Sequence, residues 1–462
     1  MYKLNYFNFK QINDTFLLTT DAGKYTFINE EDFHRLIKKE ALGEELKEDL
    51  LEKGIIYEGS DEVFSNNYAK NVRKMKEYIF IPTSLHIFVV SKNCNFRCIY
   101  CQAGNLGEKE NYKMTKEVAQ KSVDIAMQSP SECLTFEFQG GEPLTNFEVI
   151  KFIIEYSKLI NSNKKIEYSL VSNLTLLTDQ MLDFFINNNV NICTSIDGNK
   201  ELHNLNRPFP GKDSFETTIK KIRRLQELNC KVNAIETTSK YSLNRFREVI
   251  DEYINLNLDS ISLRPLTQLG KADTNWKKIG YNADEFINFY KESLSYILEK
   301  NKEGYYLSES LATILLKKIL LNQPVNYMEL RSPCGGAIGQ LAYYYDGNIY
   351  TCDEARMLSE MGNNSFRLGN VYDNSFEDLI NSDVTKSLVI SSCLECIPTC
   401  SSCVYSPYCG TCPVITLAQD NNIFAHNPNE FRCKIYKGIL DILFDYIKND
   451  RDAVEIFKKW VE

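Results

Sequence analysis

The stretch LHIFVVSKNCNFRCIYC, at residues 85–101, joins a short apolar run directly to three closely spaced cysteines. The run LHIFVV is rich in β-branched and aromatic residues, so we expect a buried strand there. The thiols that follow belong to Cys94, Cys98 and Cys101. Three thiolates can hold three irons of an iron–sulfur cube while the fourth iron stays open to a non-protein ligand. The loop therefore predicts a cluster with one exchangeable position, placed where a strand ends.

A structural zinc site is the alternative for this loop. Zinc in such a site takes four protein ligands, and no fourth cysteine or histidine stands close enough in the sequence to complete the set. His86 lies upstream, inside the predicted strand. We therefore favour the iron–sulfur cluster over zinc.

From Leu85 onward, strands and helices alternate along the chain. We expect strands at residues 85–90, 133–138, 166–172, 190–196, 230–238 and 260–266, and helices near 115–128, 146–160, 178–188, 214–228 and 243–254. Six strand-then-helix units predict parallel strands with helical crossovers. The pattern favours an α/β fold built as a partial (β/α)6 TIM-like barrel. In such barrels the chemistry lies at the carboxyl ends of the strands, and the polar motifs QGGEP, SN, DG and RPLTQLG fall there.

Composition limits the partners and the compartment. The chain has 462 residues, with 53 basic and 62 acidic side chains and a formal net charge of −9. This charge gives no case for nucleic acid or an anionic membrane as a partner. We find neither an apolar run of about 18 residues nor the features of a signal peptide, so we expect a cytoplasmic protein. In a reducing compartment, 15 cysteines indicate metal ligands rather than disulfides.

The cysteines also mark the division of the chain. Three lie at 94–101 and nine at 334–433, while Cys133, Cys193 and Cys230 stand alone and are expected to be small buried apolar residues. Before the barrel, short strands and two helices form a small α+β unit, with Asn29 as a helix N-cap. We expect six parts: that unit at 1–58, an irregular linker at 59–82, the barrel at 83–275, a helical bridge at 276–330, a cysteine-rich domain at 331–436, and a C-terminal helix at 437–462.

The Cys-x3-Cys-x2-Cys loop, its preceding strand and the later GGEP motif resemble the radical S-adenosylmethionine (SAM) superfamily. In that family the open iron binds the amino and carboxylate groups of SAM, and the reduced cluster cleaves SAM to a 5′-deoxyadenosyl radical that abstracts hydrogen. The resemblance implies that SAM is held by residues at successive strand ends. These are Tyr100 beside the cluster, Gly140, Gly141 and Glu142, then Ser172 and Asn173, and then Ser195, Asp197 and Arg207. Each of these motifs alone is also typical of an ordinary strand-end turn.

The C-terminal cysteines are similar in spacing to the SPASM extension of peptide-modifying radical SAM enzymes, which carries two auxiliary 4Fe–4S clusters. With the cluster of the loop, the resemblance implies three 4Fe–4S clusters and SAM as cofactors. For the further auxiliary cluster it implies Cys400, Cys403, Cys409 and Cys433. For the nearer one it implies Cys334, Cys352 and Cys412, which leaves that cluster one ligand short. Cys393 or Cys396 could complete it, with Cys393 preferred, or the position could be open to substrate. Two zinc knuckles are the alternative, although the five-residue spacer between Cys403 and Cys409 is tighter than usual for zinc.

Asp353 directly follows Cys352. In sulfatase-maturing relatives an acid at this point contacts the substrate and can accept a proton, so Asp353 is the candidate catalytic residue. A solvated acid in a loop is the alternative.

The stretches LNYFNF and FLLTTDAGKYTFINEEDFHRL near the N-terminus, together with CSSCVYSPYCGTCPV, look most like the B-type maturases of His-Xaa-Ser ribosomal-peptide systems. The resemblance runs over nearly the whole chain. The resemblance implies that residues 1–58 form a winged-helix-like domain that binds the leader of a ribosomal precursor peptide. It also implies a flavodoxin- or ferredoxin-type electron donor and an oxidative product: a carbon–carbon crosslink, a cyclopropane or a thioether. The alternatives are a residue oxidase like the sulfatase maturases, and a non-catalytic, zinc-stabilised peptide-binding protein.

Overall fold

The computed structural model describes residues 2–103, 112–425 and 430–462. Met1 of the predicted N-terminal domain, and residues 426–429 of the predicted cysteine-rich domain, lie outside the described residues.

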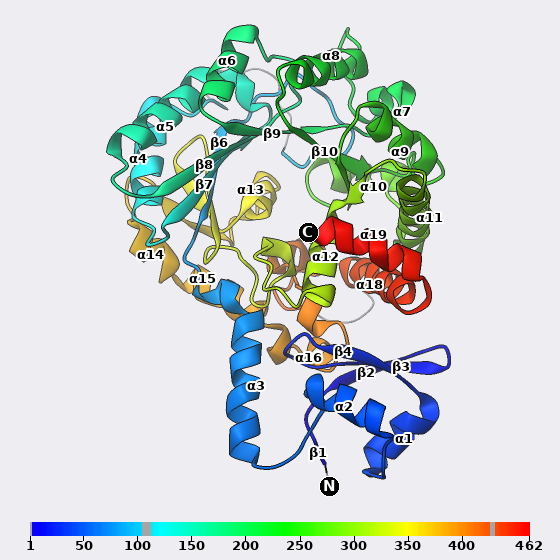
Figure 1. Cartoon of the computed structure of the whole chain (residues 1–462). Helices are drawn as coiled ribbons and strands as arrows, with labels where there is room; N and C mark the ends of the chain where they lie inside the picture. Colours follow the sequence, from blue (N-terminus) through cyan, green and yellow to red (C-terminus); the bar gives the residue numbers. More distant parts are fainter. Residues whose placement is uncertain (1, 104–111, 426–429) are drawn as a thin grey trace.

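Among the described residues, a ten-stranded sheet forms the centre of the molecule (Figure 1). Its middle consists of the six predicted strands, which run parallel and in chain order: β6 (Leu85–Ser91), β7 (Cys133–Gly140), β8 (Lys165–Val171), β9 (Val190–Ser195), β10 (Val232–Thr238) and β11 (Ser260–Pro265). The apolar run of β6 is buried from His86 to Ser91, as expected of a parallel strand covered on both faces. The sheet curves and helices cover its outer side (Figure 1). The predicted α/β fold with a partial barrel is confirmed.

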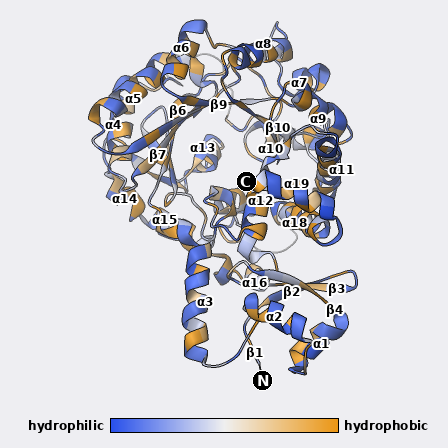
Figure 2. Cartoon of the chain, viewed as in Figure 1, coloured by the Kyte–Doolittle hydropathy of each residue, from blue (hydrophilic) through white to orange (hydrophobic). Residues whose placement is uncertain are grey.

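The predicted crossover helices cover the outer face of the sheet: α4 (Lys116–Met127), α5 (Phe147–Ile160), α6 (Asp179–Asn187), α8 (Ser214–Glu227) and α9 (Phe246–Asn255). Thr115, Thr178 and Asp213 cap three of them by accepting a backbone N–H. Figure 2 shows hydrophilic and hydrophobic residues together on these helices, as expected of helices with one buried side. A short additional helix, α7 (Lys200–Asn206), was not predicted.

The sheet continues beyond the six barrel strands at both edges. β12 (Ser308–Glu309) pairs with β11, and β13 (Gln340–Tyr343) pairs in parallel with β6. β14 (Asn348–Tyr350) and β15 (Arg367–Asn370) then follow antiparallel. The cysteine-rich domain is therefore continuous with the barrel sheet, which brings its cysteines close to the barrel.

The N-terminal unit has the strands and helices expected of it. β2 (Asn8–Ile12), β3 (Thr15–Thr19) and β4 (Tyr25–Asn29) form an antiparallel sheet, and β1 (Lys3–Leu4) pairs with β5 (Ile56–Tyr57). The helices are α1 (Glu30–Lys38) and α2 (Glu44–Glu52), and Asn29 caps α1 as predicted.

The N-terminal unit packs against the C-terminal part of the chain. The Thr19 hydroxyl donates to the Val404 carbonyl at 2.7 Å, and Lys10 forms an ion pair with Asp441 at 2.5 Å. The ring of Tyr25 lies 5.3 Å from that of Phe444. Direct contacts therefore hold the N-terminal unit against the C-terminal part of the chain.

Two expectations about helices were wrong. The segment 59–82 is not irregular, because it forms α3 (Asp61–Met75) and a 3-10 turn, Glu77–Phe80. Acids in the first turn of α3 and bases in its last turn complement the helix dipole. The helix has few apolar residues, so its sequence shows no helical repeat of apolar positions. The single C-terminal helix is two helices, α18 (Phe431–Asn449) and α19 (Arg451–Val461), which separate at Asp450, where the side chain caps α19.

The remaining helices lie in the bridge and the cysteine-rich domain. The bridge contains α10 (Lys271–Ile279) and the two predicted helices, α11 (Ala283–Lys302) and α12 (Ser310–Leu320). The cysteine-rich domain contains α13 (Asp353–Glu360), α14 (Phe376–Ile380), α15 (Asp383–Ser391), α16 (Pro398–Ser401) and α17 (Pro413–Asp420). None of the described helices is both long and apolar enough to cross a membrane.

Candidate active site

The cysteine loop follows β6 and is held from two sides by backbone hydrogen bonds. The N–H of Ile99 donates to the carbonyl of Asn206 at 3.0 Å, on the segment that ends α7. The N–H of Lys271, at the start of α10, donates to the carbonyl of Cys101 at 2.9 Å. The loop is thus fixed between the fourth and sixth strand ends, as the barrel arrangement predicts.

Gly140 and Gly141, at the end of β7, are required by the close approach of this loop. A Cβ on Gly140 would lie 2.1 Å from the Ser91 carbonyl oxygen, and one on Gly141 would lie 2.5 Å from the Asn93 carbonyl oxygen. Both distances are far inside van der Waals contact. The glycines therefore let the β7 end pack directly against the backbone that leads into the cysteine loop.

Glu142 is buried among hydrogen-bond donors. Its carboxylate accepts from the Leu144 N–H at 3.0 Å, the Ser172 hydroxyl at 2.7 Å and the Asn173 N–H at 2.8 Å. Burial raises its pKa to about 7 although these hydrogen bonds lower it. The carboxylate joins the second and third strand ends and is not among the groups that line the adjacent cavity.

Tyr100, Asp197 and Arg207 form one buried network. The hydroxyl of Tyr100 donates to Asp197, and Arg207 forms an ion pair with the same carboxylate at 3.0 Å. The Arg207 guanidinium also lies over the Tyr100 ring, 5.3 Å from its centroid. Burial raises the pKa of the Cys98 thiol to about 12, while the nearby Arg207 lowers it. The network therefore places a fixed cation beside the loop thiols.

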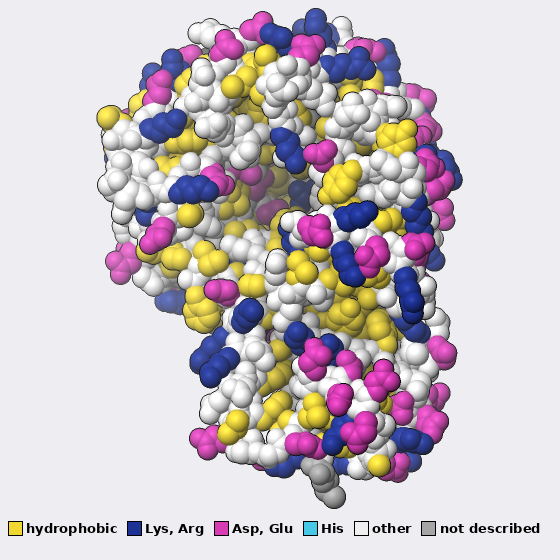
Figure 3. Space-filling view, viewed as in Figure 1, with side chains coloured by type: hydrophobic (Ala, Val, Ile, Leu, Met, Phe, Trp, Pro, Cys, Tyr) yellow, Lys and Arg dark blue, Asp and Glu magenta, His cyan; other side chains and the backbone are white. Residues whose placement is uncertain are grey.

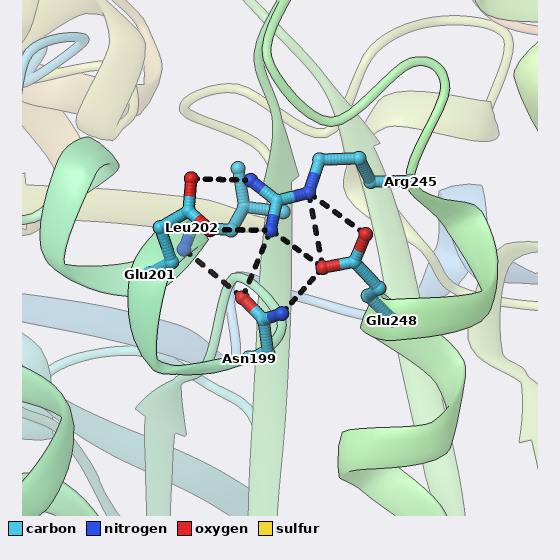
Figure 4. A network of polar contacts seen from close by, with 5 residues as sticks. All are labelled: Asn199, Glu201, Leu202, Arg245 and Glu248. Atoms are coloured by element: carbon cyan, nitrogen blue, oxygen red, sulfur yellow. Dashed lines mark hydrogen bonds and ion pairs between the residues drawn. The ribbon is translucent and has the colours of Figure 1, made fainter.

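A second network fixes the start of α7, which carries Arg207 at its other end. Arg245 forms an ion pair with Glu248 at 2.5 Å, contacts Glu201 and donates to Asn199 at 3.3 Å (Figure 4). Asn199 is the N-cap of α7. These contacts hold the helix that positions Arg207.

Most of the predicted residues face one cavity of about 440 Å³ at the strand ends. Figure 3 shows a hollow in this part of the surface, with acidic and basic side chains inside it. Of the predicted residues, the cavity is lined by Cys94, Cys98, Tyr100, Cys101, Gly140, Gly141, Ser172, Asn173, Ser195, Arg207 and Asp353. Asp197 and Glu142 lie behind this wall and support it.

The predicted catalytic acid, Asp353, is paired. Its carboxylate accepts from Arg356 at 2.5 and 3.1 Å, and both side chains are buried. Asp353 nevertheless lines the same cavity as the loop cysteines.

The cysteines of the C-terminal part gather in two sets. Cys334, Cys352 and Cys412 pack in one buried cluster, and Cys352 and Cys412 stand at the N-caps of α13 and α17. Cys400, Cys403, Cys409 and Cys433 line a separate cavity of about 50 Å³. Burial and the neighbouring Cys403 thiol raise the pKa of Cys409 to about 12. The groups that act on the pKa of the Cys393 thiol are Glu395, Cys396 and Lys76, while the hydroxyl of the preceding Ser392 accepts from the backbone N–H of Cys334 at 3.0 Å.

Two models of known families match parts of this chain. The family model described as the radical SAM superfamily matches residues 88–251, and the one described as an iron–sulfur cluster-binding domain, SPASM, matches residues 334–404. The chain carries a radical SAM domain and a SPASM domain.

Curated relatives share these domains. A cysteine-type anaerobic sulfatase-maturating enzyme of Clostridium novyi is 26% identical over 335 residues, which are 71% of this chain and 86% of that protein. The radical SAM cyclopropyl synthase TigE of Paramaledivibacter caminithermalis is 25% identical over 357 residues, 73% of this chain and 69% of that protein.

Two solved structures share the fold. Native anSMEcpe with bound AdoMet superposes with a TM-score of 0.68 at 22% identity, over 81% of this chain and 100% of that chain. SuiB of Streptococcus suis bound to precursor peptide SuiA gives 0.57 at 15% identity, over 94% of this chain and 100% of that chain.

The donor sets fit iron–sulfur clusters. All 15 cysteines are free thiols, and the radical SAM loop presents three of them to a cavity. In the C-terminal part of the chain, four thiols line a small cavity. Within the described ranges 2–103, 112–425 and 430–462, no three His, Cys, Asp or Glu side chains converge as they would around a single metal ion.

Several cavity residues were not predicted from the sequence. Glu137, Cys193, Arg264, Glu329 and Glu354 line the same cavity. Cys193 was expected to be an ordinary buried residue, and Cys133 is exposed rather than buried. The sequence signal for Arg264 was its place at the sixth strand end. No sequence pattern predicted Glu329 as a cavity residue, because it belongs to the bridge and not to a strand end of the barrel.

Proposed function

We propose that this chain is a radical SAM enzyme that modifies a ribosomally made precursor peptide, as in the B-type maturases of His-Xaa-Ser systems. Hydrogen abstraction from an unactivated carbon would lead to a carbon–carbon crosslink, a cyclopropane or a thioether. The observation that carries the proposal is the N-terminal unit, which is docked against the SPASM domain and α18 and still exposes an aromatic surface.

That surface lies on the N-terminal sheet and α1. Phe9 is 52% exposed and its ring lies 5.0 Å from that of Phe33. Phe33 in turn stacks on Phe16 at 4.0 Å. An exposed aromatic side chain on a small sheet suits the addition of an extended peptide, with side-chain pockets beside it. We assign the leader of the precursor to this surface.

The cofactors would be held by the residues described above. Cys94, Cys98 and Cys101 would bind the SAM cluster, and the two C-terminal sets would bind the auxiliary clusters. When bound, the reduced cluster and SAM together supply one-electron chemistry that abstracts a hydrogen atom from carbon. An external flavodoxin- or ferredoxin-type protein would supply the electron.

The protein's own residues hold the remainder of the site. Ser172, Asn173 and Ser195 present hydroxyl and amide groups to the cavity for the polar parts of SAM. Arg207 keeps a positive charge beside the loop thiols. The Asp353 carboxylate, held by Arg356, faces the cavity as an acceptor for a substrate proton.

A residue oxidase like the sulfatase maturases is the second candidate. It is supported by the sulfatase-maturating relatives and by Asp353. The docked N-terminal unit favours the precursor peptide, since SuiB, whose fold spans more of this chain than that of anSMEcpe, is a protein solved with a precursor peptide.

The experiment is anaerobic co-expression of the chain with candidate precursor peptides, followed by mass spectrometry of each peptide. The proposal predicts the loss of two hydrogen atoms per event, at a site that fragmentation locates. An unmodified precursor together with conversion of a sulfatase cysteine or serine would favour the residue oxidase. Zinc in place of iron in the purified chain would leave only the non-catalytic peptide-binding protein.

A further inference from the structure

Cys393 and Cys396 form a pair that stands outside the cysteine loop and outside the two C-terminal sets of thiols described above. The other cysteines outside those groups, Cys133, Cys193 and Cys230, stand alone in the sequence. A Cys-x2-Cys pair is typical of thiol–disulfide exchange sites as well as of metal sites. The surroundings of the pair therefore decide what it can do.

The two thiols lie on one side of a single turn. Cys393 directly precedes the 3-10 turn Leu394–Cys396, and the backbone N–H of Cys396 donates to the Cys393 carbonyl at 2.9 Å. Side chains three residues apart in a 3-10 turn eclipse each other. The Cα atoms at the two ends of such a turn lie within about 7 Å, and those of a disulfide lie about 4.4–6.8 Å apart. The turn therefore brings the two thiols within reach of an S–S bond.

The two thiols differ in exposure. Both are free, and Cys396 is exposed while Cys393 is partly exposed. Burial, then the Glu395 carboxylate and the Cys396 thiol, raise the pKa of Cys393. Exchange with an external disulfide depends on access to the attacking thiol. Cys396 is therefore the thiol that reacts first, and Cys393 is the neighbour that completes the exchange.

Polar contacts on both sides hold the turn in place. The Leu394 N–H donates to the Ser332 hydroxyl at 2.9 Å, and that hydroxyl donates to the Glu395 carboxylate at 2.8 Å. Glu395 also forms an ion pair with Lys76, the C-cap of α3. A fixed turn keeps the two thiols together, which favours a bond within the pair over reaction with a second external molecule. The same contacts place the pair between α3 and the loop that leads to Cys334.

We propose that Cys393 and Cys396 are a thiol–disulfide exchange site, whose partner is the disulfide of a low-molecular-mass thiol. The Cys396 thiolate attacks one sulfur of that disulfide, forms a mixed disulfide and releases one small thiol. The Cys393 thiol then attacks the Cys396 sulfur, so that the Cys393–Cys396 bond forms and the second small thiol leaves. The pair loses two electrons and two protons, and the external disulfide gains them.

This exchange site depends neither on the proposed reaction nor on its peptide. It does compete with one prediction, because a thiol bound to the iron of the nearer auxiliary cluster is not free to exchange. Cys393 as the fourth ligand of that cluster and Cys393 as half of an exchange pair are therefore alternatives, and one experiment separates them.

The test uses the full iron-loaded chain under anaerobic conditions, in mixtures of reduced and oxidised glutathione at which the parent keeps its iron. The samples are then denatured, free thiols are alkylated, and a protease that cleaves after glutamate divides the pair at Glu395. A bond between the two cysteines then appears in the mass spectrum as two linked peptides, 378–395 and 396–430. Cys393→Ser and Cys396→Ser are compared with the parent, and Cys133→Ser is the control, since this thiol is exposed but has no neighbouring cysteine in the sequence.

The linked peptides are expected in the parent and in Cys133→Ser at oxidising glutathione ratios, and should disappear at reducing ratios. Neither Cys393→Ser nor Cys396→Ser should give them, and Cys393→Ser should instead hold glutathione on Cys396. Both variants should keep the iron of the parent. Alkylated Cys393 and Cys396 at every ratio, or a bond from Cys393 to a different cysteine, would overturn the inference. Loss of about four irons per chain in Cys393→Ser would also overturn it, and would assign this thiol to the nearer cluster.

Discussion

The loop cysteines of the radical SAM domain and the four-cysteine set of the SPASM domain differ in what surrounds them. Cys94, Cys98 and Cys101 open on a cavity of about 440 Å³. Cys400, Cys403, Cys409 and Cys433 line one of about 50 Å³. We propose that the number of thiols follows access: four where the chain closes the site, and three where SAM would reach the metal.

The largest effect should come from the open site. Replacing Cys98 with alanine removes one of the three thiols of the loop. We expect SAM cleavage to fall by at least about 10³-fold, measured as 5′-deoxyadenosine formed under dithionite. About eight of roughly twelve irons per chain should remain, at four per cluster.

The matched control is Cys230→Ala, which removes a thiol outside every cluster set. It should keep both iron and SAM cleavage. Full activity of Cys98→Ala would break the distinction between open and closed sites.

A substitution in the four-cysteine set should have the opposite effect, because SAM cleavage should be kept while peptide modification is lost. Cys409→Ala should cost about four irons per chain and lower the melting temperature, because the N-terminal unit packs on the segment around this set through Thr19 and Val404. SAM cleavage without peptide should stay within about threefold of the parent, while modified peptide is lost. Loss of SAM cleavage with intact loop iron would show that the two sites are not separable.

Arg207 tests whether the open site depends on its cation. Arg207→Lys keeps the charge but loses the planar group that contacts both Asp197 and the Tyr100 ring. We expect kcat/KM for SAM to fall by roughly 10–100-fold, about 1.4–2.8 kcal/mol. Arg245→Lys, which alters only the support of α7, should have a smaller effect, and equal effects would contradict a direct role for Arg207.

A substitution on the exposed aromatic surface of the N-terminal unit should weaken precursor binding modestly. Phe9→Asp places a charge on the exposed aromatic side chain, and we expect precursor affinity to weaken by about tenfold, measured by fluorescence anisotropy. Uncoupled SAM cleavage should not change. Val63→Asp on α3 is the control, because this side chain is also exposed but lies outside residues 1–58. An equal loss of precursor affinity in Val63→Asp would contradict leader binding at the Phe9 surface.

The smallest effect is a pH dependence at Glu142. Its folded pKa is about 7 against an ordinary value near 4.5, so between these values the folded chain holds a proton that the unfolded chain has lost. Its contribution to stability is therefore full below about pH 4.5 and is lost as the pH rises through 7. Urea unfolding of the metal-free chain should show a decline of roughly 1–3 kcal/mol over this range, which Glu142→Gln reduces. An unchanged slope in that variant would contradict the assignment.

Local patterns predicted much of this molecule. The six parallel strands, the crossover helices and the Asn29 cap follow from apolar periodicity and capping residues, while the cluster ligand sets implied by the SPASM resemblance stay predictions. What failed depended on contacts between distant segments. No local pattern indicates that β13 pairs with β6 or that Glu329 reaches the cavity from the bridge. α3 was missed because a mostly polar helix has no apolar period to detect.

The most direct test of the account asks which cluster binds SAM. Electron–nuclear double resonance of the reduced protein, with SAM labelled at its amino nitrogen by a heavy isotope, reports whether that nitrogen lies on iron. The account predicts a nitrogen coupling in the parent and in Cys409→Ala, and none in Cys98→Ala. A coupling that persists in Cys98→Ala, or is absent from an iron-loaded parent, would contradict the central claim that the three-thiol loop is the SAM site.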